Sequence, residues 1–288
     1  MNGTRLLLPL LAAVLVAGTG CAKADLGAPG DTGSTGSYAA DAAVVQVSYL
    51  GGFVSPDMLV TRLPLVSVYG DGRVVTEGPV IAIYPGPALP NVQVAQISVA
   101  DVDKLVQLGV DAGVGANVDY GRPGITDVPD TKFAVLTPSG IKTSQVYALG
   151  EADGHGLTDP QIAARAKLKA YLGQLTDLPK TLGKDAVSES KPFEPKALAA
   201  VSRPWIADAS GVGQQPEVAW PGPALPGEPV RPGFDLGCVT VTGDQLTATL
   251  AAARKANTAT PWTSEGKRWS VAFRPLLPDE AGCADLKG

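Results

Sequence analysis

Residues 63–76 read LPLVSVYGDGRVVT, and they carry the clearest indication of how this chain folds. Two apolar runs, 63–69 and 73–76, flank the turn residues Gly70-Asp71-Gly72. Asp-Gly between such runs is typical of a β-hairpin, because glycine adopts the positive φ angles that tight hairpin turns need. The stretch therefore predicts two antiparallel strands joined by a short turn.

A second hairpin is predicted further along the chain. Strands over 133–137 and 142–149 flank the turn residues Pro138-Ser139-Gly140. Successive hairpins, rather than strands alternating with helices, are typical of antiparallel sheets. Further strands are predicted over residues 44–49, 80–84, 92–97, 197–202, 218–220, 238–242 and 269–274.

Helices are predicted at three places. Ser98 and Asp101 match a capping box, which starts a helix over 98–112. Asp159 as the cap, with a proline after it, predicts a second helix. Thr242 and Gln245 form another capping-box pattern, before a helix over 242–256. The second helix is expected to bury Ile162, Leu168, Tyr171, Leu172 and Leu175. The predicted fold class is α+β: antiparallel hairpins with two or three helices packed on one face.

One six-residue sequence, PGPALP, occurs twice, at 85–90 after Tyr84 and at 221–226 after Trp220. An extended segment and a capped helix follow each copy. Two interpretations stand: a reused loop that packs an aromatic side chain, or an internal duplication of a strand–loop–strand–helix unit.

The N-terminus has the order of an export signal. Arg5 is followed by the apolar run 6–17 and the small residues Gly18-Thr19-Gly20, and Cys21 comes next. The run is shorter than the about 20 apolar residues that a membrane span needs. The segment resembles the lipobox of bacterial lipoproteins. The alternative is an ordinary secretory signal that leaves Cys21 as a plain thiol.

The lipobox resemblance implies that the Cys21 thiol is diacylated, with a palmitate-type chain among its lipids. The lipid on Cys21 would then hold the protein at the extracytoplasmic face of the cell membrane, so the membrane itself is an expected partner. The expected organisation is a signal peptide over 1–20, a flexible tether over 21–42, an α+β domain over 43–180 and a smaller α+β unit over 195–288, with a Pro- and Lys-bearing linker between the two.

The chain has three cysteines, so a lipid on Cys21 leaves Cys238 and Cys283 as a pair. In an oxidising compartment this pair is expected to form a disulfide. The alternative is two buried free thiols. Neither cysteine lies in a CxxC motif, and no histidine accompanies them, so no metal site is expected there.

Composition argues against several functions. The net charge of −5 and the pI near 5.0 provide no basic surface for nucleic acid. The single histidine, His155, lies in a glycine-rich loop near three carboxylates, which we interpret as solvated. The sequence contains no G-x-S-x-G, G-x-G-x-x-G or Walker A motif. Ser188-Glu-Ser-Lys191 matches S-x-x-K, but it lies in a polar linker. We therefore expect no catalytic residues, no cofactor and no enzyme activity, with a hydrolase as the least favoured reading.

All four tryptophans lie in the last third of the chain, at positions 205, 220, 262 and 269. Such a density could line a groove for carbohydrate or peptide, but it more often builds a core beside a disulfide. We therefore interpret these side chains as core residues.

Two family resemblances can be stated. The Cys21 lipobox, the segment YGDGR over 69–73 and the tail RPLLPDE over 274–280 resemble secreted lipoproteins of high-GC Gram-positive bacteria. That resemblance implies a location and no activity. Residues 44–178 are similar to emfourin-type inhibitors of thermolysin-like proteases. The residues that carry this similarity are Gly51-Gly52-Phe53, Leu105, Thr126-Asp127 and the strand over 133–137.

The expected function is a non-enzymatic, lipid-anchored binding module for an unknown envelope ligand or protein. The alternative is an extracytoplasmic protease inhibitor of the emfourin type. One structural feature separates the two: a binding module should have an apolar or aromatic cleft, whereas an inhibitor should present an exposed, rigid loop.

Overall fold

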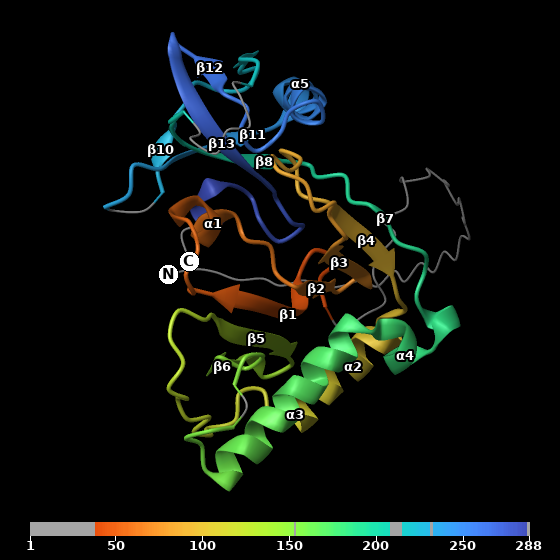
Figure 1. Cartoon of the computed structure of the whole chain (residues 1–288). Helices are drawn as coiled ribbons and strands as arrows, with labels where there is room; N and C mark the ends of the chain where they lie inside the picture. Colours follow the sequence, from red (N-terminus) through yellow and green to blue (C-terminus); the bar gives the residue numbers. More distant parts are fainter. Residues whose placement is uncertain (1–37, 153, 208–214, 231–232, 287–288) are drawn as a thin grey trace, which may run out of the picture. The chain divides into compact units, whose positions relative to one another are not determined.

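The structure, a computed structural model, describes residues 38–152, 154–207, 215–230 and 233–286. These residues belong to one compact unit, 34–288. The expected signal peptide, Cys21 and most of the expected tether lie outside the described residues. The fold is mixed α+β, as the hairpin pattern predicts, with two mostly antiparallel sheets (Figure 1).

The first sheet has seven strands in the order β6-β5-β1-β2-β3-β4-β7, and every neighbouring pair is antiparallel. Both predicted hairpins are confirmed, β2–β3 around the Gly70–Gly72 turn and β5–β6 around Gly140. Gly72 has a φ of +87°, the left-handed conformation for which glycine is suited. The strands are β1 Ala43–Leu50, β2 Val66–Tyr69, β3 Arg73–Glu77, β4 Val92–Gln96, β5 Asp130–Thr137, β6 Gly140–Tyr147 and β7 Lys191–Pro192.

The second sheet has six strands in the order β10-β11-β8-β13-β12-β9. Only the pair β12 and β9 is parallel. The long strands β8 and β13 occupy the middle of the sheet and pair with each other along the whole length of β8. The strands are β8 Leu198–Pro204, β9 Val218–Ala219, β10 Glu228–Pro229, β11 Gly237–Val241, β12 Trp262–Ser264 and β13 Lys267–Pro275.

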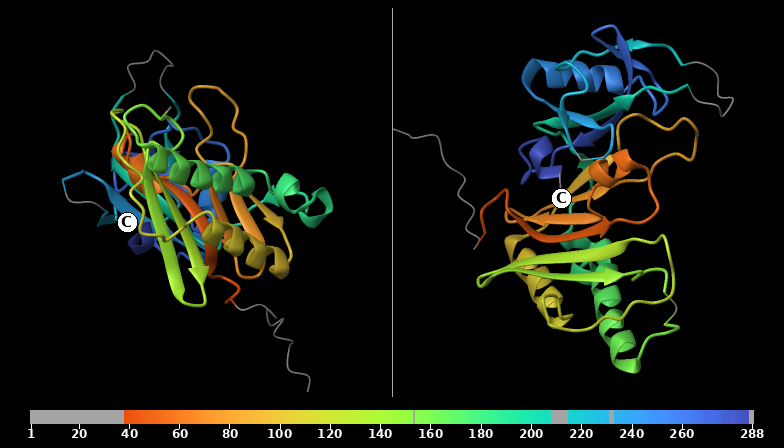
Figure 2. Two further views of the ribbon diagram at one scale, coloured as in Figure 1. Left: turned by 90° about the horizontal axis from the view of Figure 1, so that it is seen from below. Right: turned by 90° about the vertical axis from the view of Figure 1, so that its left-hand side faces the viewer.

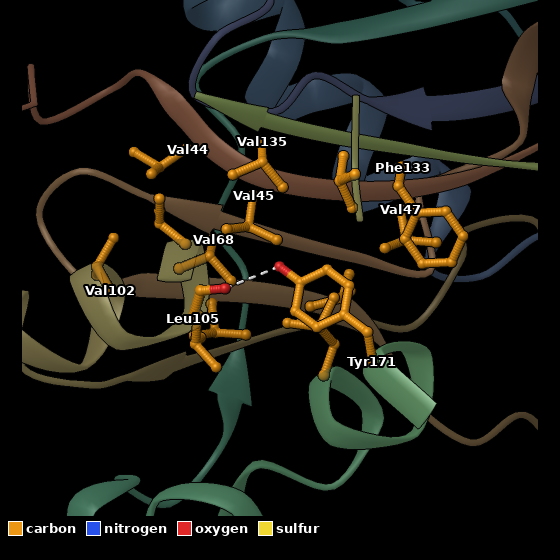
Figure 3. Packing of buried hydrophobic residues seen from close by; sticks show 14 of the residues in the cluster. Val44, Val45, Val47, Val68, Val102, Leu105, Phe133, Val135 and Tyr171 are labelled. Atoms are coloured by element: carbon orange, nitrogen blue, oxygen red, sulfur yellow. Dashed lines mark hydrogen bonds between the residues drawn. The ribbon is translucent and has the colours of Figure 1, made fainter. Parts of the chain in front are cut away.

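Two helices, α2 and α3, cover one face of the first sheet (Figure 2). Their apolar residues pack on β1 and β5, and the core includes Val45, Phe133 and Leu105 (Figure 3). The hydroxyl of Tyr171 on α3 donates a hydrogen bond to the backbone oxygen of Leu105 on α2, at 2.9 Å. The helices are α1 Pro56–Thr61, α2 Val99–Asp111, α3 Asp159–Thr176, α4 Leu178–Leu182 and α5 Gly243–Ala253, with short 3₁₀ turns at Lys184–Ala186 and Cys283–Leu286.

The C-terminal segment, residues 275–286, contacts the cores of both sheets. Leu276 belongs to a buried cluster on the second sheet with Val60 of α1 and Cys238. The next residue, Leu277, belongs to a cluster on the first sheet with Leu63 and others. The segment therefore packs against Val60 near the end of α1 and against Leu63, which follows the helix.

The strand predicted over 80–84 is wrong. These residues form an irregular loop between β3 and β4, and their large apolar side chains are exposed. The prolines at 79, 85 and 87 explain the difference, because proline donates no hydrogen bond to a ladder and breaks the pattern of a central strand.

The predicted helix starts are partly confirmed. Ser98 caps α2, and its side chain accepts a hydrogen bond from the Asp101 N–H. The N-cap of α3 is Thr158, one residue before the predicted Asp159, and Gln161 completes a capping box. Thr242 is the N-cap of α5, but its side chain makes no capping hydrogen bond. Two further corrections concern burial and length: Ile162 is exposed and Leu172 only partly buried, and α5 ends at Ala253.

The two PGPALP segments contact the same core. Leu225 of the second copy belongs to the buried cluster beneath α5, and Leu89 of the first copy packs against that cluster. The order of elements after each copy is alike, but the pairing differs. The hairpin after α2 joins β1 through its first strand, whereas the hairpin after α5 joins β8 through its second strand.

Candidate functional site

A cavity of about 420 Å³ lies between α1, the loop over residues 78–90 and the strands β8 and β13. We call it the α1 cleft. Its apolar lining comes from four separate segments of the chain and includes Met58, Leu63, Val80, Ile81, Leu89 and Phe273. The volume lies in the range of about 300–1,000 Å³ that is usual for small-ligand sites.

The floor of the cleft is rigid. It is formed by β8 and β13, where Arg203 lies directly opposite Ser270 in the ladder. β11 pairs with β8 up to Ser202, and β12 pairs with β13 only over residues 267–269. Residues 270–273 of β13, which line the cleft, therefore pair with β8 on one side only.

The loop over 78–90 forms one wall of the cleft, and both of its ends are fixed. The Gly78 N–H donates to Asn91 O at 2.6 Å, and Gly86 O accepts from Thr258 N–H at 2.9 Å. Between these points, four large apolar side chains are 58–64% exposed: Val80, Ile81, Ile83 and Tyr84. Two of them, Val80 and Ile81, line the cleft, where exposed apolar side chains are available to a ligand.

Four charged residues also line the cleft, and their surroundings differ. The side chain of Arg203 makes no hydrogen bond or ion pair with any other described residue. Arg62 donates through Nη1 to the backbone oxygen of Gly51 at 3.1 Å. The Oδ1 atom of Asp57 is enclosed by protein without a hydrogen-bond partner in the described part of the chain, and Glu77 is exposed.

A second, smaller hollow of about 240 Å³ lies on the other side of Arg203. It is lined by Pro56 at the start of α1 and by the exposed apolar residues Ile206 and Phe234. Arg203 therefore lines both hollows.

A buried polar network holds the C-terminal segment beneath α1. Arg274 pairs with Glu280, with 2.7 Å between Nη2 and Oε1, and the two side chains are only 3% and 14% exposed. Glu280 Oε2 also accepts the Leu277 N–H at 2.7 Å. Burial raises the pKa of the Glu280 carboxyl and lowers the pKa of the Arg274 guanidinium, and the charge of each partner opposes the shift of the other.

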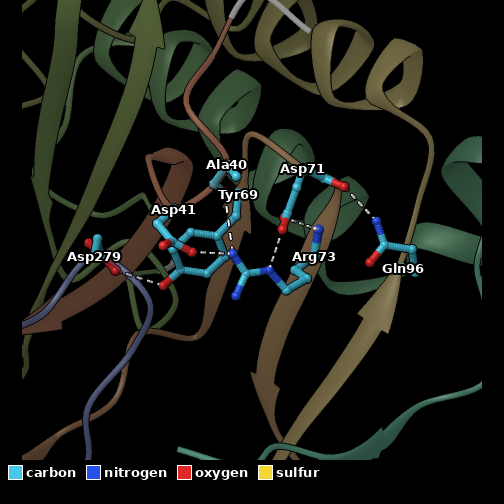
Figure 4. Close-up of polar contacts among 7 residues, drawn as sticks. All are labelled: Ala40, Asp41, Tyr69, Asp71, Arg73, Gln96 and Asp279. Atoms are coloured by element: carbon cyan, nitrogen blue, oxygen red, sulfur yellow. Dashed lines mark hydrogen bonds and ion pairs between the residues drawn. The ribbon is translucent and has the colours of Figure 1, made fainter. Parts of the chain in front are cut away.

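A neighbouring contact joins the same segment to the first sheet. The Tyr69 hydroxyl donates to Asp279 Oδ1 at 2.7 Å (Figure 4). Burial, followed by the charge of Asp279, raises the pKa of Tyr69. Arg73 lies against the same ring, with its guanidinium carbon 5.4 Å from the centroid, and it pairs with Asp71 and Asp41. The C-terminal segment is therefore joined to the end of β2 by a side-chain contact between residues far apart in the sequence.

The structure joins Cys238 and Cys283 in a disulfide, as the cysteine count predicts. The bond ties the C-terminal segment to β11, and the Cys283 N–H also donates to Thr240 Oγ1 at 3.1 Å. Cys21, the predicted lipidation site, lies outside the described residues. Sequence reasoning missed the residues of the α1 cleft, because it placed 80–84 in a strand.

The other sequence candidates lie apart from the cleft. Ser188 of the S-x-x-K motif holds the edge of the first sheet, because its Oγ accepts the Gln96 N–H at 2.9 Å. Trp262 and Trp269 are buried, and Trp262 and Trp220 pack around Phe273 as part of a core. Over the described ranges, His, Cys, Asp and Glu side chains form no cluster suited to a metal ion.

No helix within the described residues is long and apolar enough to cross a membrane. Comparison with known proteins finds no matching protein-family model, no matching curated protein and no matching solved structure. The cleft and the N-terminal signal are therefore the features that bear on function.

Proposed function

We propose that this protein is a lipid-anchored cell-envelope protein at the extracytoplasmic face of the membrane, and that it binds a ligand in the α1 cleft without transforming it. The observation that carries the proposal is the α1 cleft, whose wall includes the exposed apolar side chains of Val80 and Ile81. The polar side chains that line it carry hydroxyl, carboxylate and guanidinium groups, which can form hydrogen bonds with a bound ligand.

The position of the cleft suits a protein anchored through its N-terminus. Ala40 and Asp41 contact Arg73, at the Gly70–Gly72 end of the β2–β3 hairpin. The loop over 78–90 leaves β3 at the opposite end, after Glu77. An anchor before residue 38 would therefore attach at the end of the hairpin far from the cleft. The cleft would remain accessible from the envelope.

The anchor is tested by a Cys21→Ser variant. The wild-type protein is expected in the detergent phase of a phase-separation experiment, because two acyl chains give stable anchoring. The variant is expected in the aqueous phase and in the culture supernatant. Equal amounts of both proteins in the supernatant would refute the anchor and leave an ordinary secretory signal.

The cleft is tested by purifying the full chain from its own envelope and measuring bound mass by native mass spectrometry. The wild type is expected to carry a ligand, and Ile81→Asp is expected to lose it, because a carboxylate in the apolar wall is costly to desolvate. Ile141→Asp is the matched control, because Ile141 is 70% exposed on β6, outside the cleft. Equal loss in both variants would contradict the proposal.

One observation favours the alternative, a protease inhibitor of the emfourin type. Phe53 is 87% exposed at the tip of a short loop that is held from two sides. Its N–H donates to Asp127 O at 3.0 Å, and Gly51 O accepts from Arg62. The binding proposal expects no inhibition of a thermolysin-like protease by the full chain. Dose-dependent inhibition that Phe53→Asp abolishes would favour the inhibitor instead.

A further inference from the structure

We infer that the α1 cleft takes an anionic amphiphile, a molecule with one linear alkyl chain and a carboxylate or phosphate headgroup. The inference rests on the proposed function and adds the chemical class of the ligand. Three observations carry it: the apolar walls, the loop backbone groups that are used within the chain, and the guanidinium of Arg203, which has no partner among the described residues.

The walls favour an alkyl chain. Met58 and Leu63 approach from the α1 side, Val80 and Ile81 from the loop, and Ala272 from the sheet. Val80 and Ile81 are more than half exposed without a ligand, so an apolar occupant would remove their surface from water. A chain that fills such a cavity gains affinity with each methylene that it buries.

The loop wall offers few open backbone groups to an extended peptide. Peptides that bind along a sheet use unpaired backbone groups at an edge strand. In the loop, the Ala88 N–H donates to Ala256 O, and Gly86 O accepts from the Thr258 N–H. These loop groups are therefore already used within the chain, and the apolar side chains of the loop remain to contact a ligand.

The charges favour an anionic headgroup. Arg203 is the lining cation without a partner among the described residues, and its planar guanidinium matches a carboxylate or phosphate. Neither acid of the cleft offers a comparable site for a cation. Asp57 Oδ1 is enclosed by protein atoms, and Glu77 is exposed where water solvates it.

The test titrates defined amphiphiles into the full Cys21→Ser chain, which has no acyl chains of its own. Octanoate, decanoate, dodecanoate and dodecyl phosphate are used below their micellar concentrations, with dodecyltrimethylammonium as the cationic comparison. We expect saturable one-to-one binding of dodecanoate or dodecyl phosphate by calorimetry. Affinity should rise about threefold to fourfold for each added methylene. Tighter binding of dodecanoate would indicate a fatty acid as the ligand, and tighter binding of dodecyl phosphate would indicate a phospholipid-like molecule.

Variants locate the site. Arg203→Gln is expected to weaken binding of the anionic amphiphiles about tenfold, and Arg203→Lys to restore part of it. Ile81→Asp is expected to weaken it at least as much. Arg122→Gln and Ile141→Asp are the matched controls, because both residues are exposed outside the cleft. These controls should bind as the unsubstituted chain does.

Two results would overturn the inference: no saturable binding of any anionic amphiphile, or equal binding of dodecyltrimethylammonium with no effect of Arg203→Gln. Neither result would by itself refute the proposed function. The binding part of that proposal fails if no ligand from the native envelope depends on Ile81, so the two failures are distinguishable.

Discussion

Replacing Glu280 by glutamine is expected to lower the free energy of unfolding by about 3–5 kcal/mol. The substitution keeps the side-chain volume and removes the charge that faces Arg274, which is almost wholly buried. An uncompensated buried guanidinium is costly, because the protein interior solvates it poorly. Urea denaturation of the full chain measures the change.

A surface ion pair in the same part of the chain provides the control. Arg268 and Glu217 are 3.5 Å apart, and each side chain is about half exposed. Glu217→Gln is therefore expected to change the free energy of unfolding by about 1 kcal/mol or less, because water screens exposed pairs. Equal effects of Glu280→Gln and Glu217→Gln would show that burial does not set the strength of the first pair.

Removing the disulfide by the double substitution Cys238→Ala and Cys283→Ala is expected to lower the free energy of unfolding by about 4 kcal/mol. The two cysteines are 45 residues apart, and the bond restricts a loop of that length in the unfolded chain. Denaturation of the variant and of the reduced wild type measures the effect.

Reduction itself provides the control for this prediction. A reducing agent should destabilise the wild type and leave the double variant unchanged. A non-reducing peptide map should show the two cysteine peptides joined in the wild type. Two alkylatable thiols in the folded wild type would contradict the disulfide, and a stability unaffected by reduction would contradict its predicted contribution.

Both predictions concern the segment that supports α1, so they also bear on the cleft. Val60 of α1 packs with Leu276, and Leu63, which lines the cleft, packs with Leu277. Loosening residues 275–286 would therefore remove the support of one wall. We expect both sets of variants to weaken ligand binding without any change in the lining residues.

Features that depend on neighbours along the chain could be predicted from the residues alone. The Gly70–Gly72 turn was correctly placed because glycine and aspartate favour tight hairpin turns. The start of α2 was predicted because Ser98 reaches a backbone N–H only three residues away. The disulfide was predicted because the chain has three cysteines and a lipid on Cys21 leaves the other two to pair. Each of these inferences needs few residues and no knowledge of distant contacts.

Features that depend on long-range packing could not be predicted in this way. Residues 80–84 have the composition of a strand, but no neighbouring strand pairs with them, and they form the exposed wall of the cleft. Arg165 lies on a predicted helix face, yet it is buried and donates to the backbone oxygens of Tyr120, Tyr147 and Ala148. Burial of a polar side chain depends on acceptors that local periodicity does not reveal.

The candidate site itself belongs to this second class. Its walls come from α1, from the loop over 78–90 and from strands more than a hundred residues later in the chain. The contact between Tyr69 and Asp279 spans 210 residues. Turns and caps could be predicted because they involve residues close together in the sequence. The disulfide could be predicted because a lipid on Cys21 leaves two cysteines to pair with each other. The cleft exists because packing brings separate segments together around groups that no local pattern connects.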